Sequence, residues 1–203
     1  INYGIDLNRF NPAKPMNDLR QELGIVPGKT VVGYLVRMTV QKDPFTLIRA
    51  VAEVAKKTRD VQFLFIGDGA RELNVSDMIT FHPFRTDIPE VLNTFDIYTL
   101  PSLWEGLPIG MLEAMGMQKA IVATPVDGTK EAISEGQNGL LVPCKDHVAL
   151  ANAIIRLHEN PELRKVLGAA ARKTVEDTFD VKMMVRNNEN LYQRQMPMLQ
   201  VAA

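Results

Sequence analysis

Two basic and two acidic residues stand at spacings that could hold an anionic ligand with hydroxyl groups. Arg37 and Lys42 lie five residues apart, directly after the apolar run 31–36, and Glu105 and Glu113 lie eight residues apart in a later segment. Arginine offers a planar fork to phosphate oxygens and lysine a compact point charge, a combination that suits a diphosphate. The carboxylates could accept hydrogen bonds from hydroxyls of a ribose and of a second polyol. Solvated surface charges are the alternative interpretation of the two cations.

The residues between the two glutamates predict the N-terminus of a helix. Pro108 suits the first helical position, which leaves Glu105 in the preceding loop and places Glu113 on the helix, roughly 7.5 Å further along its axis. The N–H groups of Ile109 and Gly110 would then be unpaired and would favour an anion. Gly110 would also let a bulky ligand approach the backbone. An ordinary helix with an acidic first turn is the alternative interpretation.

Short β-rich apolar runs alternate with helix-periodic segments along the chain. The expected strands are 31–36, 61–66, 78–81, 96–100, 119–124 and 139–142; the expected helices are 43–57, 88–95, 108–115 and 129–134, and then 146–158, 161–176 and 181–195. This alternation predicts an α/β fold with a buried, six-stranded parallel sheet and C-terminal helices. Such sheets bind ligands beyond the carboxyl ends of their strands, where the four charged residues are expected.

Composition favours one folded domain and excludes several function classes. The chain has 203 residues, 46% of them hydrophobic, and 23 basic side chains against 24 acidic ones. Without a basic surplus, we expect no nucleic-acid partner. The run after the first strand has no G-x-G-x-x-G and no Walker motif, which argues against dinucleotide and P-loop sites. No D-x-D metal signal is present, so we expect no metal.

The cysteine content and the start of the chain bear on its context. Cys144 is the only cysteine, so it can form no internal disulfide, and we expect a cytoplasmic location. No apolar run approaches the ~20 residues needed to cross a bilayer. The chain begins at Ile1 rather than Met and is expected to be a piece of something longer.

Several segments together resemble one family across nearly the whole chain. They are 4–10, 37–44, 65–69, 84–89, 101–106 and 131–139, together with the pattern E-x7-E formed by Glu105 and Glu113. Their order and spacing are similar to the nucleotide-sugar domain of retaining GT-B-fold glycosyltransferases, the group that includes glycogen and sucrose synthases. The resemblance implies a Rossmann-like, doubly wound sheet that forms one half of a GT-B fold.

The resemblance also implies roles for individual residues. Arg37 and Lys42 would contact the donor diphosphate, Glu105 the transferred sugar and Glu113 the ribose; backbone groups around Gly106, Leu107, Ile109 and Gly110 would hold sugar and phosphate, and Phe84 and Arg85 would lie near the base. The donor would be a UDP- or GDP-sugar, and no further cofactor would be required.

The resemblance implies an enzyme that resembles hexosyltransferases and retains the configuration of the transferred sugar. Residues 1–203 would form its donor domain, which would be inactive by itself. Its N-terminal acceptor domain would be absent from these residues. That domain would be its partner, would select an acceptor glycan, lipid or small molecule, and would carry any contact with a membrane. One alternative is a non-catalytic nucleotide-sugar-binding module. Another is a glycosidase with Glu105 and Glu113 as its acid and nucleophile, which leaves Arg37 and Lys42 unexplained.

The chain departs from the family pattern at a few turns. Gln118 stands where a glycine is common, which is costly if the helix end there needs a left-handed residue. Asp127 replaces one glycine of a pair. The segment 70–77 is shorter than the helical crossover usual at that place. These departures concern turns and local packing rather than the proposed donor contacts.

Overall fold

The computed structural model describes residues 2–69 and 77–200, and its centre is a six-stranded, wholly parallel sheet in the order β3-β2-β1-β4-β5-β6. The strands are β1 Thr30–Leu35, β2 Val61–Ile66, β3 Ile79–His82, β4 Ile97–Leu100, β5 Ala120–Ala123 and β6 Leu140–Leu141. All six predicted strands are present; β4, β5 and β6 are shorter than predicted, and the other three have the predicted length, with β1 and β3 shifted by one residue. The predicted α/β architecture is therefore confirmed.

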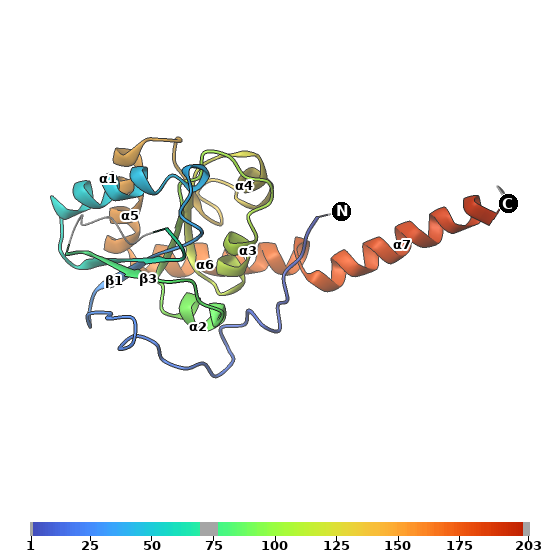
Figure 1. The fold of residues 1–203 in the computed structure, drawn as a ribbon, viewed down its shortest axis with the longest axis horizontal. Coiled ribbons are helices and arrows are strands. Elements are labelled where there is room, and N and C mark those ends of the chain that lie inside the picture. The colour runs from blue at the N-terminus through green and yellow to red at the C-terminus, as the bar shows by residue number, and fades with distance from the viewer. Residues whose placement is uncertain (1, 70–76, 201–203) are drawn as a thin grey trace.

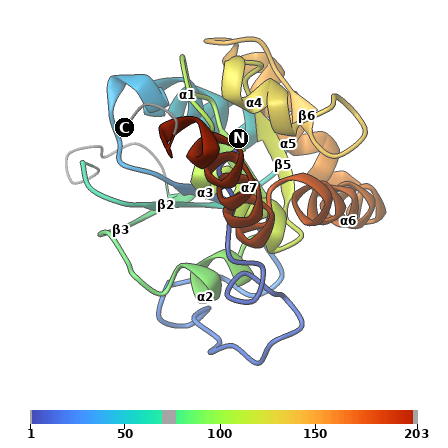
Figure 2. The same ribbon diagram turned by 90° about the vertical axis from the view of Figure 1, so that its right-hand side faces the viewer.

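Helices cover both faces of the sheet (Figures 1 and 2). They are α1 Pro44–Ala55, α2 Ile88–Asn93, α3 Ile109–Gly116, α4 Asp127–Ala132, α5 His147–Glu159, α6 Pro161–Thr178 and α7 Val181–Gln200, with a 3-10 turn, η1, at Val40–Lys42. One buried apolar cluster joins α1 and α5 to the sheet, and a second joins α2 and α3 to its other face. Alternate residues of one strand enter opposite clusters, as with Phe63 and Leu64 in β2. The doubly wound arrangement is confirmed.

The start of the chain and the last helix meet at the edge of the body. The backbone N–H of Ile5 donates to Phe179 O at 2.8 Å, and Val181 N donates to Ile5 O at 3.0 Å. From there α7 extends away from the sheet (Figure 1). The structure thus ends this helix at Gln200, five residues later than predicted. Within the described part of the chain, no helix combines the length and apolarity needed to cross a membrane.

Local chemistry explains where the helices nearest the predicted site begin and end. Asp43 caps α1 with its side chain, which accepts from Thr46 N at 3.2 Å and from Thr46 Oγ1 at 2.6 Å. The prediction that Pro108 occupies the first position of its helix is wrong by one residue. Its extended ψ of 98° makes it the N-cap, and its carbonyl accepts from Met111 N and Leu112 N.

Gln118 and Asp127, two of the departures from the family pattern, lie at the end of one helix and at the start of another. Gln118 has a φ of 56°, so the turn after α3 does need a left-handed residue, as the sequence suggested. The helix that includes Asp127 begins at that residue, two positions earlier than predicted. The short segment at 70–76 lies outside the described residues.

Candidate functional site

Arg37, Lys42 and Glu105 come together where the strand order reverses. β1 and β4 are neighbours in the sheet, while their following helices, α1 and α3, lie in the two different apolar clusters. The loops after these strands diverge from one point, which is where open parallel sheets form a ligand crevice. Arg37 and Lys42 come from the loop after β1, and Glu105 comes from the loop after β4.

Buried groups beneath Lys42 fix the backbone of its loop. The hydroxyl of Tyr34 donates to Lys42 O at 2.8 Å, and the Tyr34 side chain is fully buried beside the ring of Phe65. Burial raises the pKa of Tyr34, so this hydroxyl stays a donor at ordinary pH. The other side of the loop touches Gly67, where a Cβ would meet Val36 O at 2.0 Å. Gly67 therefore allows the two loops to approach closely.

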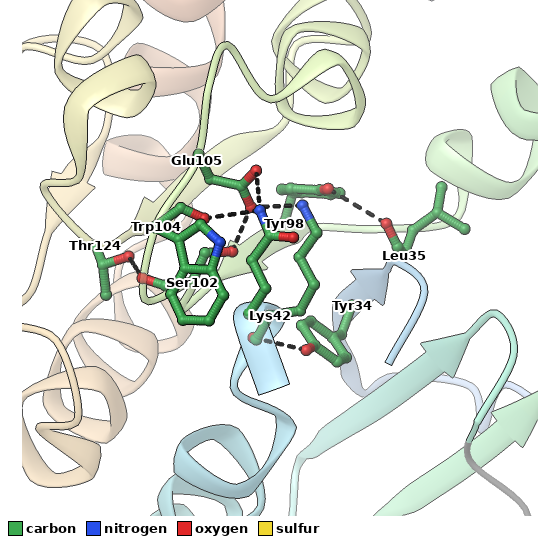
Figure 3. Close-up of polar contacts among 9 residues, drawn as sticks. Tyr34, Leu35, Lys42, Tyr98, Ser102, Trp104, Glu105 and Thr124 are labelled. Carbon is green, nitrogen blue, oxygen red and sulfur yellow. Dashed lines mark hydrogen bonds and ion pairs between the residues drawn. The ribbon is translucent and has the colours of Figure 1, made fainter. Parts of the chain in front are cut away.

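Lys42 and Glu105 form an ion pair at the centre of the site (Figure 3). Lys42 Nζ lies 2.5 Å from Glu105 Oε1. The Glu105 side chain is only 6% exposed and that of Lys42 21%. The resemblance assigned these two groups to different parts of a ligand, whereas the structure places them in contact with each other.

Gln41 joins the two loops a second time. Its backbone carbonyl accepts from Leu103 N at 2.8 Å, and its side-chain Nε2 donates to Trp104 O at 2.9 Å. The same Nε2 lies 3.4 Å from Glu105 Oε2. Sequence reasoning missed Gln41, because a glutamine in a loop carries no local signal for a partner more than sixty residues away.

Two adjoining cavities lie beside this ion pair and share four lining residues, Leu35, Val36, Arg37 and Gly110. The larger cavity, of about 280 Å³, also includes Phe84 and Glu113 in its wall. The smaller one, of about 190 Å³, includes Lys42, Pro108 and Ile109. A cation and the N-terminus of α3 thus lie on one side of Arg37, and a carboxylate on the other. A ligand spanning both cavities would have its anionic part nearer Lys42.

Glu113 is a half-buried carboxylate with a perturbed pKa. Burial raises the pKa of Glu113 from 4.5 to about 6, and the nearby charge of Arg9 partly opposes the shift. Sequence reasoning gave Arg9 no role. The Arg9 guanidinium donates to Thr86 O at 3.2 Å and lies over the Phe10 ring, which places a cation near Glu113.

A glycine that the sequence analysis did not single out fixes the loop after Glu105. A Cβ on Gly128, in the first turn of α4, would meet Gly106 O at 1.3 Å and Leu107 N at 2.7 Å. No side chain fits there, so the two backbones are in direct contact. Gly106 itself has nothing within 4 Å of its own would-be Cβ, and Leu107 packs against the apolar cluster around α3.

The two residues expected near a base have different surroundings. Phe84 is 63% exposed and lines the larger cavity. Arg85 instead forms ion pairs with Asp87 and with Glu22, each at 2.5 Å, and the residues that line the cavity do not include it. These carboxylates raise the pKa of Arg85.

Across residues 2–69 and 77–200, no three His, Cys, Asp or Glu side chains group so as to hold a metal ion.

Comparison with known proteins gives this arrangement a context. The family of glycosyl transferases group 1 matches residues 15–174. The chain is 26% identical over 202 residues to the UDP-Gal:alpha-D-GlcNAc-diphosphoundecaprenol alpha-1,3-galactosyltransferase of Escherichia coli, covering 93% of this chain and 52% of that protein. It is also 29% identical over 209 residues to a GDP-mannose-dependent monoacylated alpha-(1-6)-phosphatidylinositol monomannoside mannosyltransferase of Corynebacterium glutamicum. That match covers 94% of this chain and 54% of the other protein.

A solved structure extends the comparison to the fold. Anabaena Alr3699/HepE in complex with UDP-glucose superposes with a TM-score of 0.82 at 26% identity, covering 94% of this chain and 56% of that one. The chain therefore spans about half the length of the relatives that it matches.

Proposed function

Because this chain belongs to the glycosyl transferases group 1 family, we propose that it is the donor half of a glycosyltransferase. It binds a nucleoside-diphosphate sugar and stabilises the diphosphate that departs during transfer. The observation that carries the proposal is the pair of adjoining cavities joined at Arg37, with Lys42 and the start of α3 on one side and Glu113 on the other. Along such a donor, the diphosphate would lie near Lys42 and the start of α3, and the ribose near Glu113. Glu105, which is paired with Lys42, would lie toward the sugar, and Phe84, in the wall of the larger cavity, toward the base.

The chemistry proposed here is electrostatic stabilisation of the leaving group. The bond between the anomeric carbon and the diphosphate oxygen breaks, and its electron pair remains on the diphosphate. Arg37, Lys42 and the free N–H groups at the start of α3 oppose this growing negative charge. An acceptor hydroxyl bonds to the anomeric carbon with retention of configuration, and its proton passes to the departing diphosphate.

Glu105 and Glu113 act on opposite ends of the proposed donor. Glu113 accepts hydrogen bonds from the ribose hydroxyls in the larger cavity, and Glu105 accepts them from the transferred sugar. Backbone groups of Gly106, Leu107, Ile109 and Gly110 hold the sugar and phosphates. Phe84 lies beside the base, where its exposed ring offers a stacking surface. Arg85 would reach the base only by leaving Asp87 and Glu22.

The relatives that this chain matches use donors with two different bases. The Escherichia coli relative takes a UDP-sugar by its name and the Corynebacterium relative GDP-mannose, so the family accommodates both. We propose that residues 1–203 are the donor domain and that a separate N-terminal domain holds the acceptor, since the chain spans about half of each relative.

Calorimetric titration of the chain with UDP, GDP, ADP, UDP-glucose and GDP-mannose, with and without EDTA, tests the proposal. One nucleoside diphosphate and its conjugate should bind, with affinities that EDTA leaves unchanged, and no sugar transfer should be detectable. If none of the five ligands binds, the donor assignment is wrong. If binding disappears in EDTA and returns only with Mg²⁺ or Mn²⁺, the metal-free stabilisation of the diphosphate is wrong.

A further inference from the structure

The Glu105 carboxylate is held by more than its ion pair with Lys42. Ser102 Oγ donates to Glu105 Oε1 at 2.6 Å, on the same oxygen that Lys42 contacts at 2.5 Å. Gln41 Nε2 approaches the other oxygen, Oε2, at 3.4 Å. Figure 3 shows Lys42 and Ser102 beside the Glu105 carboxylate. Two of the three donors are uncharged.

The two uncharged donors are themselves fixed. Ser102 is completely buried, and its carbonyl accepts from Thr124 Oγ1 at 2.5 Å, in the segment that follows β5. The serine is therefore tied to two neighbouring strands, β4 and β5. Gln41 is tied to the Glu105 loop through Leu103 N and Trp104 O. These contacts hold the backbone of Ser102 and both the backbone and the side chain of Gln41, and none of them involves Lys42.

Under the proposed function, the Lys42 ammonium contacts the diphosphate and the Glu105 carboxylate contacts the sugar. The ion pair between the two groups must therefore open in part when the donor binds. A carboxylate that is 6% exposed could reach little water if its cation turned away. We infer that Ser102 and Gln41 are positioning residues, which keep Glu105 in its sugar-facing place when Lys42 turns to the diphosphate. This inference rests on the proposed function for its purpose, although the positioning itself can be tested without a donor.

Crystal structures of two ligand-free variants test the positioning. In Lys42→Met, Glu105 should keep its conformation, because Ser102 and Gln41 still donate to it. In Lys42→Met/Ser102→Ala/Gln41→Leu, the Glu105 side chain should leave this position. If Glu105 moves as soon as Lys42 is replaced, the ion pair alone held it and the inference is wrong. If Glu105 stays in the triple variant, the two residues are dispensable and the inference is also wrong.

Binding measurements test the consequence for the sugar. The readout is the affinity advantage of UDP-glucose over UDP, or of GDP-mannose over GDP, in the Ser102→Ala variant. This advantage should fall about tenfold, while affinity for the free diphosphate changes less than twofold, because the lost hydrogen bond is to a charged group. In a Glu105→Ala background, Ser102→Ala should have no further effect on the advantage. Ser134→Ala, at an exposed serine two residues after the end of α4, is the control.

The outcomes separate the two proposals. Equal weakening of conjugate and free diphosphate by Ser102→Ala would indicate a structural role only and would overturn the inference. Additive effects of Ser102→Ala and Glu105→Ala would overturn it as well. If the unaltered chain binds none of these ligands, the proposed function fails for these donors, and the crystallographic comparison still decides whether Ser102 and Gln41 position Glu105.

Discussion

Lys42 and Glu105 are separated by 63 residues in the chain and by 2.5 Å between Nζ and Oε1 in the fold. The contact joins the loop after β1 to the loop after β4, at the point where the helices that follow these strands pass to opposite faces of the sheet. The ion pair therefore holds the two loops together. A change at either residue should therefore affect both ligand binding and the stability of this crevice.

Replacing Lys42 with alanine should weaken binding of the nucleoside diphosphate about ten- to a hundredfold, because a charge-assisted contact worth ~1.5–3 kcal/mol is lost. Titration calorimetry measures the change. Lys57→Ala, at an exposed lysine, is the control and should alter the binding free energy by less than about 0.5 kcal/mol. Equal effects of the two substitutions would support the interpretation of Lys42 as an ordinary surface charge.

Glu113→Ala should weaken the free nucleoside diphosphate and its sugar conjugate by the same factor. Both ligands contain the ribose hydroxyls, and each hydrogen bond to a carboxylate is worth ~1.5–3 kcal/mol. Competition titrations with the two ligands give the two factors. A loss confined to the conjugate would place Glu113 at the sugar rather than at the ribose.

Glu105→Ala should behave differently from Glu113→Ala. It should remove the affinity advantage of the conjugate over the free diphosphate, since its proposed partner is the transferred sugar, and should lower the rate of transfer in the full-length enzyme. The same titrations measure this effect. If the free diphosphate suffers as much as the conjugate, Glu105 is not a sugar contact and serves instead to hold Lys42 and the loop in place.

The raised pKa of Glu113 predicts a pH dependence of binding and of stability. Only the ionised carboxylate accepts hydrogen bonds from both ribose hydroxyls, so with a pKa of about 6 the affinity should drop about fourfold from pH 7 to pH 5.5. Because the folded-state pKa exceeds the unfolded one, the carboxyl's contribution to stability is present below pH 4.5 and is lost as the pH rises through about 6.

Glu113→Gln separates this effect from titration of the ligand's own phosphates. The fourfold drop should be absent from the glutamine variant, so it should remain in the difference between the two proteins' pH profiles, where the titration of the ligand's phosphates cancels. Denaturant unfolding of both proteins between pH 4 and pH 7 should show the stability change only in the unaltered chain. Parallel pH profiles in the two proteins would contradict the assignment to Glu113.

Gly128→Ala should destabilise the protein by about 1–3 kcal/mol, because the added methyl group overlaps the Gly106 carbonyl and must displace the Glu105 loop. Denaturant unfolding measures the loss, and binding of the conjugate should weaken along with it. Gly106→Ala is the matched stability control, since its added Cβ would meet nothing within 4 Å. Similar stability losses in the two variants would indicate that the contact between α4 and the loop is unimportant.

Much of the fold was readable from local patterns. Strands buried on both faces must be continuous apolar runs, which is why β1 and β2 were found nearly at their true bounds. The ends of helices are harder to predict from a sequence, because a single ψ angle decides whether a residue is the N-cap or the first residue of the helix. Pro108 satisfies the sequence rule for the first helical position, but its extended ψ of 98° makes it the N-cap instead.

The sequence by itself determined the order of strands and helices along the chain, as distinct from their order in the sheet. It also placed Glu105 on a loop and Glu113 on a helix, because these assignments follow from the hydrophobic periodicity and the turn residues close by in the chain. Only the tertiary structure decided that Lys42 contacts Glu105, that Gly128 lies against Gly106, and that Arg85 is held by Glu22 and Asp87. These contacts join distant segments, and their distances depend on strand order, register and packing, none of which is encoded in the local propensity of any one segment.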